Sequence, residues 1–339
     1  MKKKVVTLGE IMMRLSPVQN KRFIQSNNFE INFGGAEANV AVLLSHLGLE
    51  STFVTKLPSN QIGEMVLGYL RSNGVDINNI AIGGDRVGVY YFEKGVSTRN
   101  AQVVYDRKGS SMSEAIIEDF NLEEIFKNAS LFHVSGITPA LGEDGIKIVK
   151  ECIEYCKNNN IRVSVDLNYR SKLWSYKKFN KVMKEIVKGV DICIGWIDLD
   201  SSADEFTPVK FNNLEDEKLY FNKVFRLMKE ELGVKHVATT LRETISASEN
   251  TLRGLIYNGE EIIYSRKYSF EIIDRVGAGD AFAGGLLYKL LEEESYEEII
   301  EFAVASGVYK HTIQGDASIA TKEEIETVIK GMLAGGVAR

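Results

Sequence analysis

The stretch that decides the fold is DRVGAGDAFAGG, residues 274–285. After Gly279 and Asp280 the apolar residues recur at helical spacing, at Ala281, Phe282, Leu286, Leu287, Leu290 and Leu291. The pattern predicts a helix that begins near Ala278–Asp280, with unpaired backbone N–H groups in its first turn. Such a helix start attracts anions, and glycines allow a ligand to approach the backbone closely. An aspartate at the same point can accept the proton of a substrate hydroxyl.

An anion site beside a general base suits phosphoryl transfer. The alternative is an ordinary helix N-terminus with a stabilising acid in its first turn. Two other phosphate-binding motifs are excluded. The chain has no GxxxxGK[ST] loop, and Phe282 occupies the place of the third glycine of GxGxxG.

Composition narrows the class of protein. The 339 residues are 44% hydrophobic and 26% charged, as in ordinary globular domains. A net charge of −6 argues against a nucleic-acid partner. Three cysteines fit a reducing compartment, and Cys152 and Cys156 lack a second pair with which to bind a metal. Since no segment reads as a signal peptide or a membrane span, we expect a cytoplasmic protein with no membrane partner.

Short β-branched runs alternate with longer helical patterns along the chain. Strands are predicted at 5–9, 51–57, 130–136, 161–168, 190–195 and 235–241. Helices are predicted at 38–48, 63–74, 142–160 and 176–189, the first two ending at Gly48 and Gly74. This succession implies an α/β fold in which helices cover both faces of a parallel sheet.

One region departs from this alternation. Residues 86–108 contain two strand patterns joined by a turn, and with residues 11–33 they could form a small antiparallel sheet. The alternative is a hairpin without a role. We predict a single domain over 1–339, with a lid formed from about 11–33 and 86–109 inserted in the α/β core.

The glycine–aspartate stretch resembles the C-terminal signature of the ribokinase/PfkB family of carbohydrate kinases. FGGAEANVAVLLSHLG, residues 33–48, resembles the family's N-terminal signature, and the two occur in the family's order. The resemblance covers essentially the whole chain. It implies a ribokinase-like three-layer α/β/α core with a mostly parallel sheet and a small β-sheet lid.

The resemblance also implies roles for individual residues. Asp280 would deprotonate the sugar hydroxyl, and the N–H groups of Gly277, Ala278 and Gly279 would form the anion hole. In the N-terminal signature, the residues expected to bind the sugar are Gly34, Gly35 and Asn39. Asp274 matches a position associated with a monovalent cation such as K⁺, although a turn-capping acid is nearly as good an interpretation.

Two tyrosine–arginine pairs indicate the kind of sugar. VYDR (104–107) and DLNYR (166–170) supply Arg107 and Arg170, which would clamp a carboxylate, while Tyr90 and Tyr105 would line the pocket. The pattern resembles family members that phosphorylate 2-keto-3-deoxygluconate, which implies a 6-phosphate product. The epimer 2-keto-3-deoxygalactonate, fructose and ribose stay open as alternatives.

The resemblance implies ATP and Mg²⁺ as well. Asn168 and Arg170 would reach the nucleotide phosphates, Arg242 and Glu243 would border the nucleotide, and Gly315 would lie in the adenine-side wall. The segments that contain these residues, 239–247 and 310–316, could equally be ordinary surface loops. Lids of this kind often pair in the family, which makes a homo-oligomer plausible.

One departure concerns metal handling. Where the family usually has Asn-x-x-Glu after a core strand, this chain has Trp196 and Leu199. Asp198 or Asp200 could supply a water-bridged ligand to Mg²⁺ instead. A catalytically weakened sugar-acid sensor is therefore a second hypothesis, opposed by the intact Asp280. A dinucleotide-dependent oxidoreductase is disfavoured, because no glycine fingerprint follows the first strand.

Overall fold

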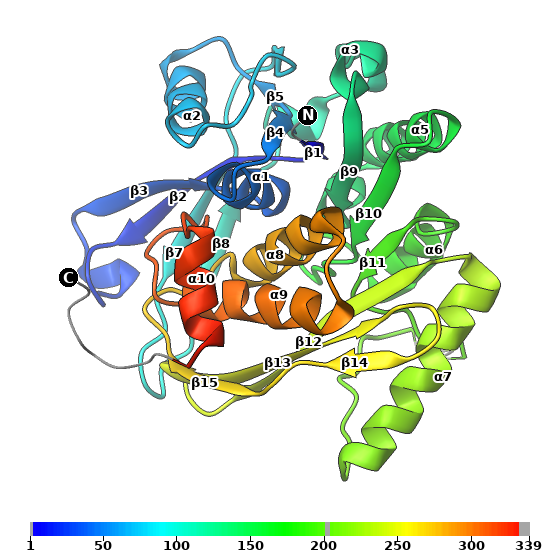
Figure 1. The fold of residues 1–339 in the computed structure, drawn as a ribbon. Coiled ribbons are helices and arrows are strands. Elements are labelled where there is room, and N and C mark those ends of the chain that lie inside the picture. Colours follow the sequence, from blue (N-terminus) through cyan, green and yellow to red (C-terminus); the bar gives the residue numbers. More distant parts are fainter. Residues whose placement is uncertain (1–2, 201–203, 332–339) are drawn as a thin grey trace.

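The computed structural model describes residues 3–200 and 204–331 of the chain. A nine-stranded sheet runs through these residues in the order β14-β13-β12-β11-β10-β9-β1-β4, with β15 paired to β13 (Figure 1). Its strands are β1 (Lys4–Leu8), β4 (Glu50–Val54), β9 (Ala129–Ser135), β10 (Arg162–Asp166), β11 (Ile192–Ile194), β12 (His236–Thr244), β13 (Glu249–Tyr257), β14 (Ile262–Tyr264) and β15 (Tyr268–Glu271).

The part of the sheet from β4 to β12 is parallel, and β13, β14 and β15 are antiparallel. The predicted α/β class and all six predicted strands are confirmed. One strand differs, because the run 51–57 divides at Thr55 into β4 and the short β5 (Lys56–Leu57). β5 leaves the large sheet and pairs with β6 (Ala81–Ile82).

Helices cover both faces of the large sheet. α1, α8 and α9 pack on one face around a cluster that includes Leu43 and Phe282 (Figure 1). α5, α6 and α7 pack on the other around Phe179 and Phe221. The bounds are α1 (Ala36–His46), α2 (Gln61–Ser72), α3 (Leu122–Phe126), α4 (Ile137–Ala140), α5 (Glu143–Asn158), α6 (Tyr176–Ile186), α7 (Leu214–Leu232), α8 (Ala278–Glu292), α9 (Tyr296–Lys310) and α10 (Lys322–Ile329).

The glycines that follow α1 and α2 explain why these helices stop. Gly48 and Gly74 have φ of 91° and 71°, a left-handed conformation that glycine adopts without strain. The next N–H donates back into the helix, from Leu49 to the Leu44 carbonyl at 3.1 Å and from Val75 to the Leu70 carbonyl at 3.1 Å. Both helices thus end in a Schellman motif, one residue before the glycine chosen from the sequence.

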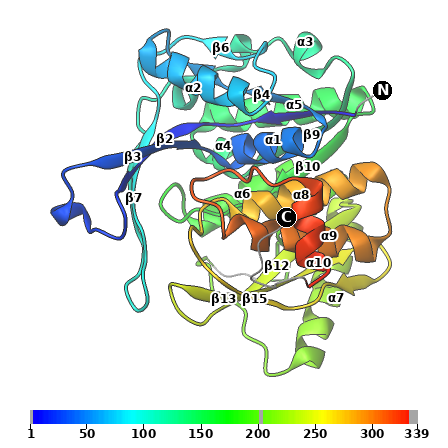
Figure 2. The same cartoon turned by 60° about the vertical axis from the view of Figure 1, so that its left-hand side comes forward.

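A second, four-stranded sheet projects from the large one (Figure 2). Its order is β3-β2-β7-β8, and the bounds are β2 (Met12–Pro17), β3 (Phe29–Gly34), β7 (Val89–Glu93) and β8 (Gln102–Asp106). These strands fall in the two segments predicted to form a small sheet, although the β2–β7 pair is parallel rather than antiparallel. The lid role and the single domain over 1–339 stay predictions.

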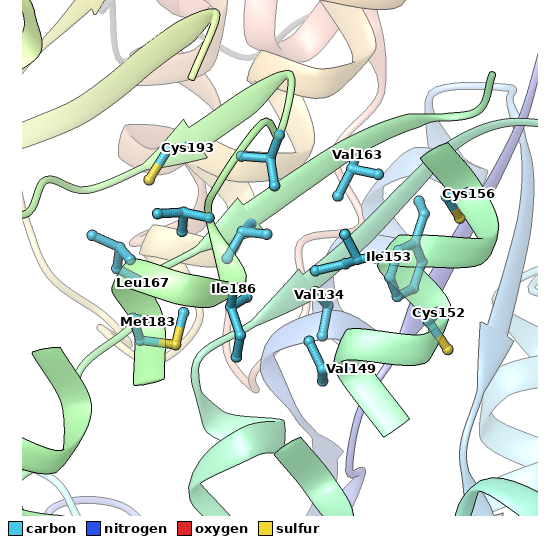
Figure 3. Close-up of a cluster of buried hydrophobic side chains, with 14 of the residues drawn as sticks. Val134, Val149, Cys152, Ile153, Cys156, Val163, Leu167, Met183, Ile186 and Cys193 are labelled. Carbon is cyan, nitrogen blue, oxygen red and sulfur yellow. The ribbon is translucent and has the colours of Figure 1, made fainter. Parts of the chain in front are cut away.

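The three cysteines lie in the apolar interior. Figure 3 shows Cys152 and Cys156 on α5 and Cys193 on β11 among Val149, Ile153 and other hydrophobic side chains. Burial raises the pKa of the Cys156 thiol to about 12, so this thiol stays protonated. Within the described residues no group of three or more His, Cys, Asp or Glu side chains is placed to hold a metal. None of the described helices is both long and apolar enough to span a bilayer.

Candidate active site

A cleft of about 760 Å³ lies where the carboxyl ends of the parallel strands face the small sheet. Ligands of open α/β sheets bind at this edge, because the loops that follow the strands converge there. The cleft brings together most of the predicted site residues, namely Gly34, Gly35, Asn39, Tyr90, Tyr105, Arg107, Asn168, Arg170, Arg242, Gly277, Ala278, Gly279 and Asp280.

The glycine turn forms the floor of this cleft. α8 begins at Ala278, as predicted, and Gly277 precedes it with φ of 79°. A side chain on Gly277 would collide with the Asp316 carbonyl, so this position requires glycine. Gly279 is exposed, with nothing within 4 Å of where its Cβ would be. The first turn of a 15-residue helix therefore opens onto the cleft, which is the geometry of an anion site.

Asp280 connects the two signature motifs. Its Oδ2 accepts a 2.7 Å hydrogen bond from Nδ2 of Asn39, which lies in the first turns of α1. Burial raises the pKa of Asp280 to about 6, although the Asn39 hydrogen bond and the Arg170 charge oppose the rise. The carboxylate is therefore mostly ionised at neutral pH, with a pKa near that expected of a general base.

Asp166, at the end of β10, is a second carboxylate at this point, and it was not among the predicted site residues. Burial, and then the nearby charge of Asp280, raise its pKa to about 7. Its oxygens accept hydrogen bonds from the Asn168 backbone N–H at 3.0 Å and from Nδ2 of Asn168 at 3.3 Å. The sequence held a clue to this residue. Asp166 is the first residue of the motif DLNYR, and it ends a strand that points into the cleft.

Gly34 and Gly35 are required by contacts within the protein. A side chain on Gly34 would collide with the Asp316 carboxylate, and one on Gly35 would collide with the Glu10 carbonyl. Asp316 also lines the cleft and was not predicted as a site residue, although the segment that contains it was noted. The hydroxyl of Tyr90 donates to Oδ2 of Asp316, which places a tyrosine and a carboxylate beside the glycine pair.

Arg107 is not a free cation. Its Nε lies 2.6 Å from Oε2 of Glu10, a buried carboxyl that also accepts a 2.5 Å hydrogen bond from Ser110. Burial raises the pKa of Glu10 even though Arg107 and Ser110 act in the opposite direction. The guanidinium lies 5.6 Å from the centre of the Tyr105 ring. Arg107 is thus held in place, with its Nη groups left to contact a ligand.

Three other arginines line the cleft without a carboxylate partner. Within residues 3–200 and 204–331, neither Arg170, Arg242 nor Arg275 forms an ion pair with an acidic side chain. Although Arg242 reaches solvent in the cleft, burial and then the charge of Arg275 lower its pKa. Arg275 donates to the Ala247 carbonyl at 3.2 Å. Like charges held together without counter-ions indicate an anionic ligand.

Arg275 was missed by the sequence reading. It is the second residue of DRVGAGD, directly before the anion turn, and only its position in space reveals that it lines the same cleft as Arg242.

Four predicted residues lie outside the cleft: Asp198, Glu243, Gly315 and Asp274. Asp198 and Glu243 line an adjoining aromatic pocket of about 670 Å³ that also contains Trp196. Asp198 accepts a 3.1 Å hydrogen bond from the Tyr220 hydroxyl, which itself accepts one from Trp196. Glu243 pairs with Lys267 at 2.6 Å. Gly315 is buried, and its N–H donates to Asp274 at 3.2 Å.

These contacts bear on the predicted metal ligand. Asp198 is turned away from the glycine turn, and Asp200 pairs with Lys223 at 2.6 Å. Neither placement supports a bridge to Mg²⁺ in the cleft. The cause is geometric, because the chain after β11 turns toward α7 and its aromatic side chains rather than toward α8.

Asp274 is likewise occupied. Its Oδ2 accepts from Arg14 at 2.7 Å and from the Gly315 N–H at 3.2 Å, and its Oδ1 accepts from the Val276 N–H at 3.2 Å. These contacts match the turn-capping alternative, and a guanidinium already neutralises this buried carboxylate; the role as a cation ligand stays a prediction.

Comparisons with known proteins show what this chain is similar to. A family model described as pfkB family carbohydrate kinase matches residues 2–322. The crystal structure of 2-dehydro-3-deoxygluconokinase from Thermotoga maritima is 41% identical, with a TM-score of 0.91 over 97% of this chain and 100% of that chain. A PfkB family carbohydrate kinase from Listeria grayi is 35% identical, with a TM-score of 0.87 over 97% and 100%. The 2-dehydro-3-deoxygalactonokinase of Haloferax volcanii is 29% identical over 98% of each chain.

Proposed function

Because this chain belongs to the pfkB family of carbohydrate kinases, we propose that it phosphorylates 2-keto-3-deoxygluconate with ATP. The product is 2-keto-3-deoxy-6-phosphogluconate. The observation that carries the proposal is the 2.7 Å contact between Asn39 and Asp280. It joins the sugar-side signature to the base at the mouth of the anion turn, so that both substrates can meet at one point.

The reaction proceeds by in-line phosphoryl transfer. Asp280 accepts the proton of the terminal hydroxyl as its oxygen attacks the γ-phosphorus of ATP. The bond between that phosphorus and the β,γ-bridging oxygen breaks, and ADP leaves. The N–H groups of Gly277, Ala278 and Gly279 stabilise the charge on the transferred group. A positioned base of this kind contributes about 10²–10⁴ in rate.

The unpaired arginines serve the nucleotide. Arg170, Arg242 and Arg275 neutralise phosphate charge, and Asn168 donates from the end of β10. Glu243 and Gly315 do not line the cleft, so the sites of the ribose and the adenine are not assigned to them.

Mg²⁺ accompanies ATP and needs only one or two carboxylates, because it keeps several waters. Asp166 fits this requirement: it is a carboxyl at the cleft edge beside Asp280, and among the described residues it forms no salt bridge, although the charge of Arg170 opposes the rise of its pKa. When bound, the metal neutralises the charge that develops on the phosphates. Trp196 and Leu199 supply no oxygen from their side chains. Asp166 therefore takes the part first assigned to Asp198.

The sugar acid lies against the small sheet. Arg107 presents its Nη groups, and Arg170 approaches from the opposite wall, so that a carboxylate can be held between two guanidinium groups. Tyr90, Tyr105 and Asp316 face the hydroxyl groups. Specificity for an acid is supported by the names of two of the similar proteins, both sugar-acid kinases.

The epimer 2-keto-3-deoxygalactonate is a second candidate substrate, because the Haloferax relative is named for it. One inverted hydroxyl changes only a few hydrogen bonds in such a pocket. The four strands of the small sheet would act as the lid over either acid.

The proposal is tested by a coupled ADP-release assay with ATP and Mg²⁺. The acceptors are 2-keto-3-deoxygluconate, its galactonate epimer, gluconate, fructose and ribose. We expect turnover on the 2-keto-3-deoxy acids and little on the neutral sugars. Preference for ribose or fructose would refute the sugar-acid assignment, and tight binding of the acid without any ADP release would favour the sensor.

A further inference from the structure

Arg14 is a fully buried cation on β2 of the small sheet. Its three nitrogens each have a partner. Nη1 donates to Oδ1 of Asp316 at 2.9 Å, Nη2 to Oδ2 of Asp274 at 2.7 Å, and Nε to Oγ of Ser16 at 2.8 Å. The guanidinium also lies 4.5 Å from the centre of the Phe92 ring. Because burying an arginine is costly, such complete pairing is what keeps it there.

The two carboxylates belong to two different loops of the cleft floor. Asp274 lies three residues before Gly277, and Asp316 follows α9. The loops contact one another directly, since the Gly315 N–H donates to Asp274 and the Gly277 backbone packs on the Asp316 carbonyl. Arg14 therefore joins the small sheet to both loops at the back of the anion turn.

Asp316 faces the cleft from this cluster. Its Oδ2 accepts from the Tyr90 hydroxyl, and Tyr90 lies beside Arg14 across the β2–β7 pair. Lys310 is a second buried cation here, and its Nζ donates to the Ile313 carbonyl at 3.0 Å. Because Lys310 is bonded to that carbonyl, Arg14 is the cation that bridges the two carboxylates. Its planar guanidinium can contact both at once.

We propose that Arg14 is a positioning residue for phosphoryl transfer: its guanidinium joins the small sheet to the loops of Asp274 and Asp316, and thereby fixes the anion turn opposite Asn39 and Asp280. This inference rests on the proposed kinase function. Arg14 touches neither substrate in this assignment, because it lies behind the turn. A shift of about 1 Å in such a turn can cost about 100-fold in rate, since the N–H groups act only when they are aimed at the transferring group.

The test compares Arg14→Ala and Arg14→Lys with Lys56→Met. The last substitution removes a partly buried ion pair, Lys56 to Asp119 at 2.7 Å, that lies outside the cleft. We expect kcat to fall about 10- to 100-fold in Arg14→Ala, with KM for MgATP changed much less, because the loss falls on the transition state. Arg14→Lys should be intermediate, since an ammonium cannot span both carboxylates. Lys56→Met should lower the Tm and leave kcat unchanged.

Two readouts separate positioning from a role in folding alone. Added guanidinium ion should restore part of kcat in Arg14→Ala and none in Lys56→Met. Hydrogen exchange of the backbone amides in 274–281 should become faster in Arg14→Ala and stay unchanged in Lys56→Met. If Arg14→Ala does not fold, the proposal is tested on Arg14→Lys, with the same comparison of kcat with KM for MgATP and the same measurement of amide exchange.

The outcomes also separate this inference from the proposed function. If the wild-type protein has no kinase activity, the proposed function is refuted. The amide exchange would still test whether Arg14 holds the loops of Asp274 and Asp316 in place. An active wild type with unchanged kcat and unchanged exchange in both Arg14 variants would overturn the inference. So would equal loss of kcat in Arg14→Ala and Lys56→Met, because it would trace the effect to stability.

Discussion

The two halves of the cleft treat their charges in opposite ways. On the small-sheet side two arginines are paired with carboxylates: Arg107 with Glu10, and Arg14 with Asp274 and Asp316. On the side of β12 and the α8 turn, Arg242 and Arg275 face the cleft with no acidic partner among the described residues. One half is neutralised and fixed in place, whereas the other is left positive.

The difference shows which half is built for which ligand. A polyphosphate brings several negative charges and can neutralise unpaired arginines itself, so counter-ions from the protein would only compete with it. A sugar acid brings one charge and several hydroxyl groups. Its recognition needs fixed hydrogen-bonding directions more than net charge, and these come from a paired network. Asp280 lies at the boundary between the halves, held by Asn39.

The largest effect is expected at that boundary. Asp280→Asn and Asp280→Ala should lower kcat by about 10²–10⁴, because the general base is lost while α8 stays intact. Circular dichroism and Tm should match the wild type. Turnover within a few-fold of the wild type in either variant would refute Asp280 as the base.

On the positive half, the double variant Arg242→Met/Arg275→Met should lower kcat/KM for MgATP roughly 100-fold, because two charges facing the phosphates are removed. The affinity for the sugar acid should change little. Arg226→Met is the control, since Arg226 is exposed on α7 and contacts Glu230 at 3.7 Å. An equal loss of affinity for the sugar would show that the two arginines do not serve the nucleotide alone.

Arg107→Ala, on the neutralised half, and Arg170→Ala, on the wall opposite it, should each lower kcat/KM for the sugar acid about 10- to 30-fold, because charged hydrogen bonds are lost. A neutral ketose of the same length should lose much less. If kcat/KM falls equally for the acid and for the neutral analogue, the two arginines do not bind the carboxylate.

Activity should decline in acid at the pKa of Asp280. Because burial raises this pKa to about 6 and the base must be ionised, kcat/KM should be constant above pH 7. It should fall about tenfold per pH unit below pH 6 as the carboxylate is protonated. If kcat/KM stays constant down to pH 5, the raised pKa of Asp280 is contradicted.

The smallest effect is expected from monovalent cations. Since Arg14 already neutralises Asp274, replacing K⁺ by tetramethylammonium should leave kcat unchanged. A requirement for K⁺ that follows a saturation curve would reinstate a cation site near the turn.

The sequence predicted the elements that depend on local pattern. The glycine turn, the start of α8 and Asn39 were recognisable because periodicity and glycine placement are written in neighbouring residues. The partners of Arg14 were not, because Asp274 and Asp316 lie 260 and 302 residues away. No local rule pairs such residues. The pocket that Asp198 lines could not be predicted for a related reason: its chemistry suits a metal, and only the path of the chain after β11 shows which pocket it faces.

The most direct test is ³¹P NMR of the product formed from ATP and 2-keto-3-deoxygluconate. If Asp280 activates the terminal hydroxyl, the spectrum should show ADP and a single phosphate monoester, split into a triplet by the two protons on its carbon. ADP with inorganic phosphate alone would show hydrolysis without transfer. A monoester split into a doublet would place the phosphate on a secondary hydroxyl. Either result would contradict the assignment of the reacting group.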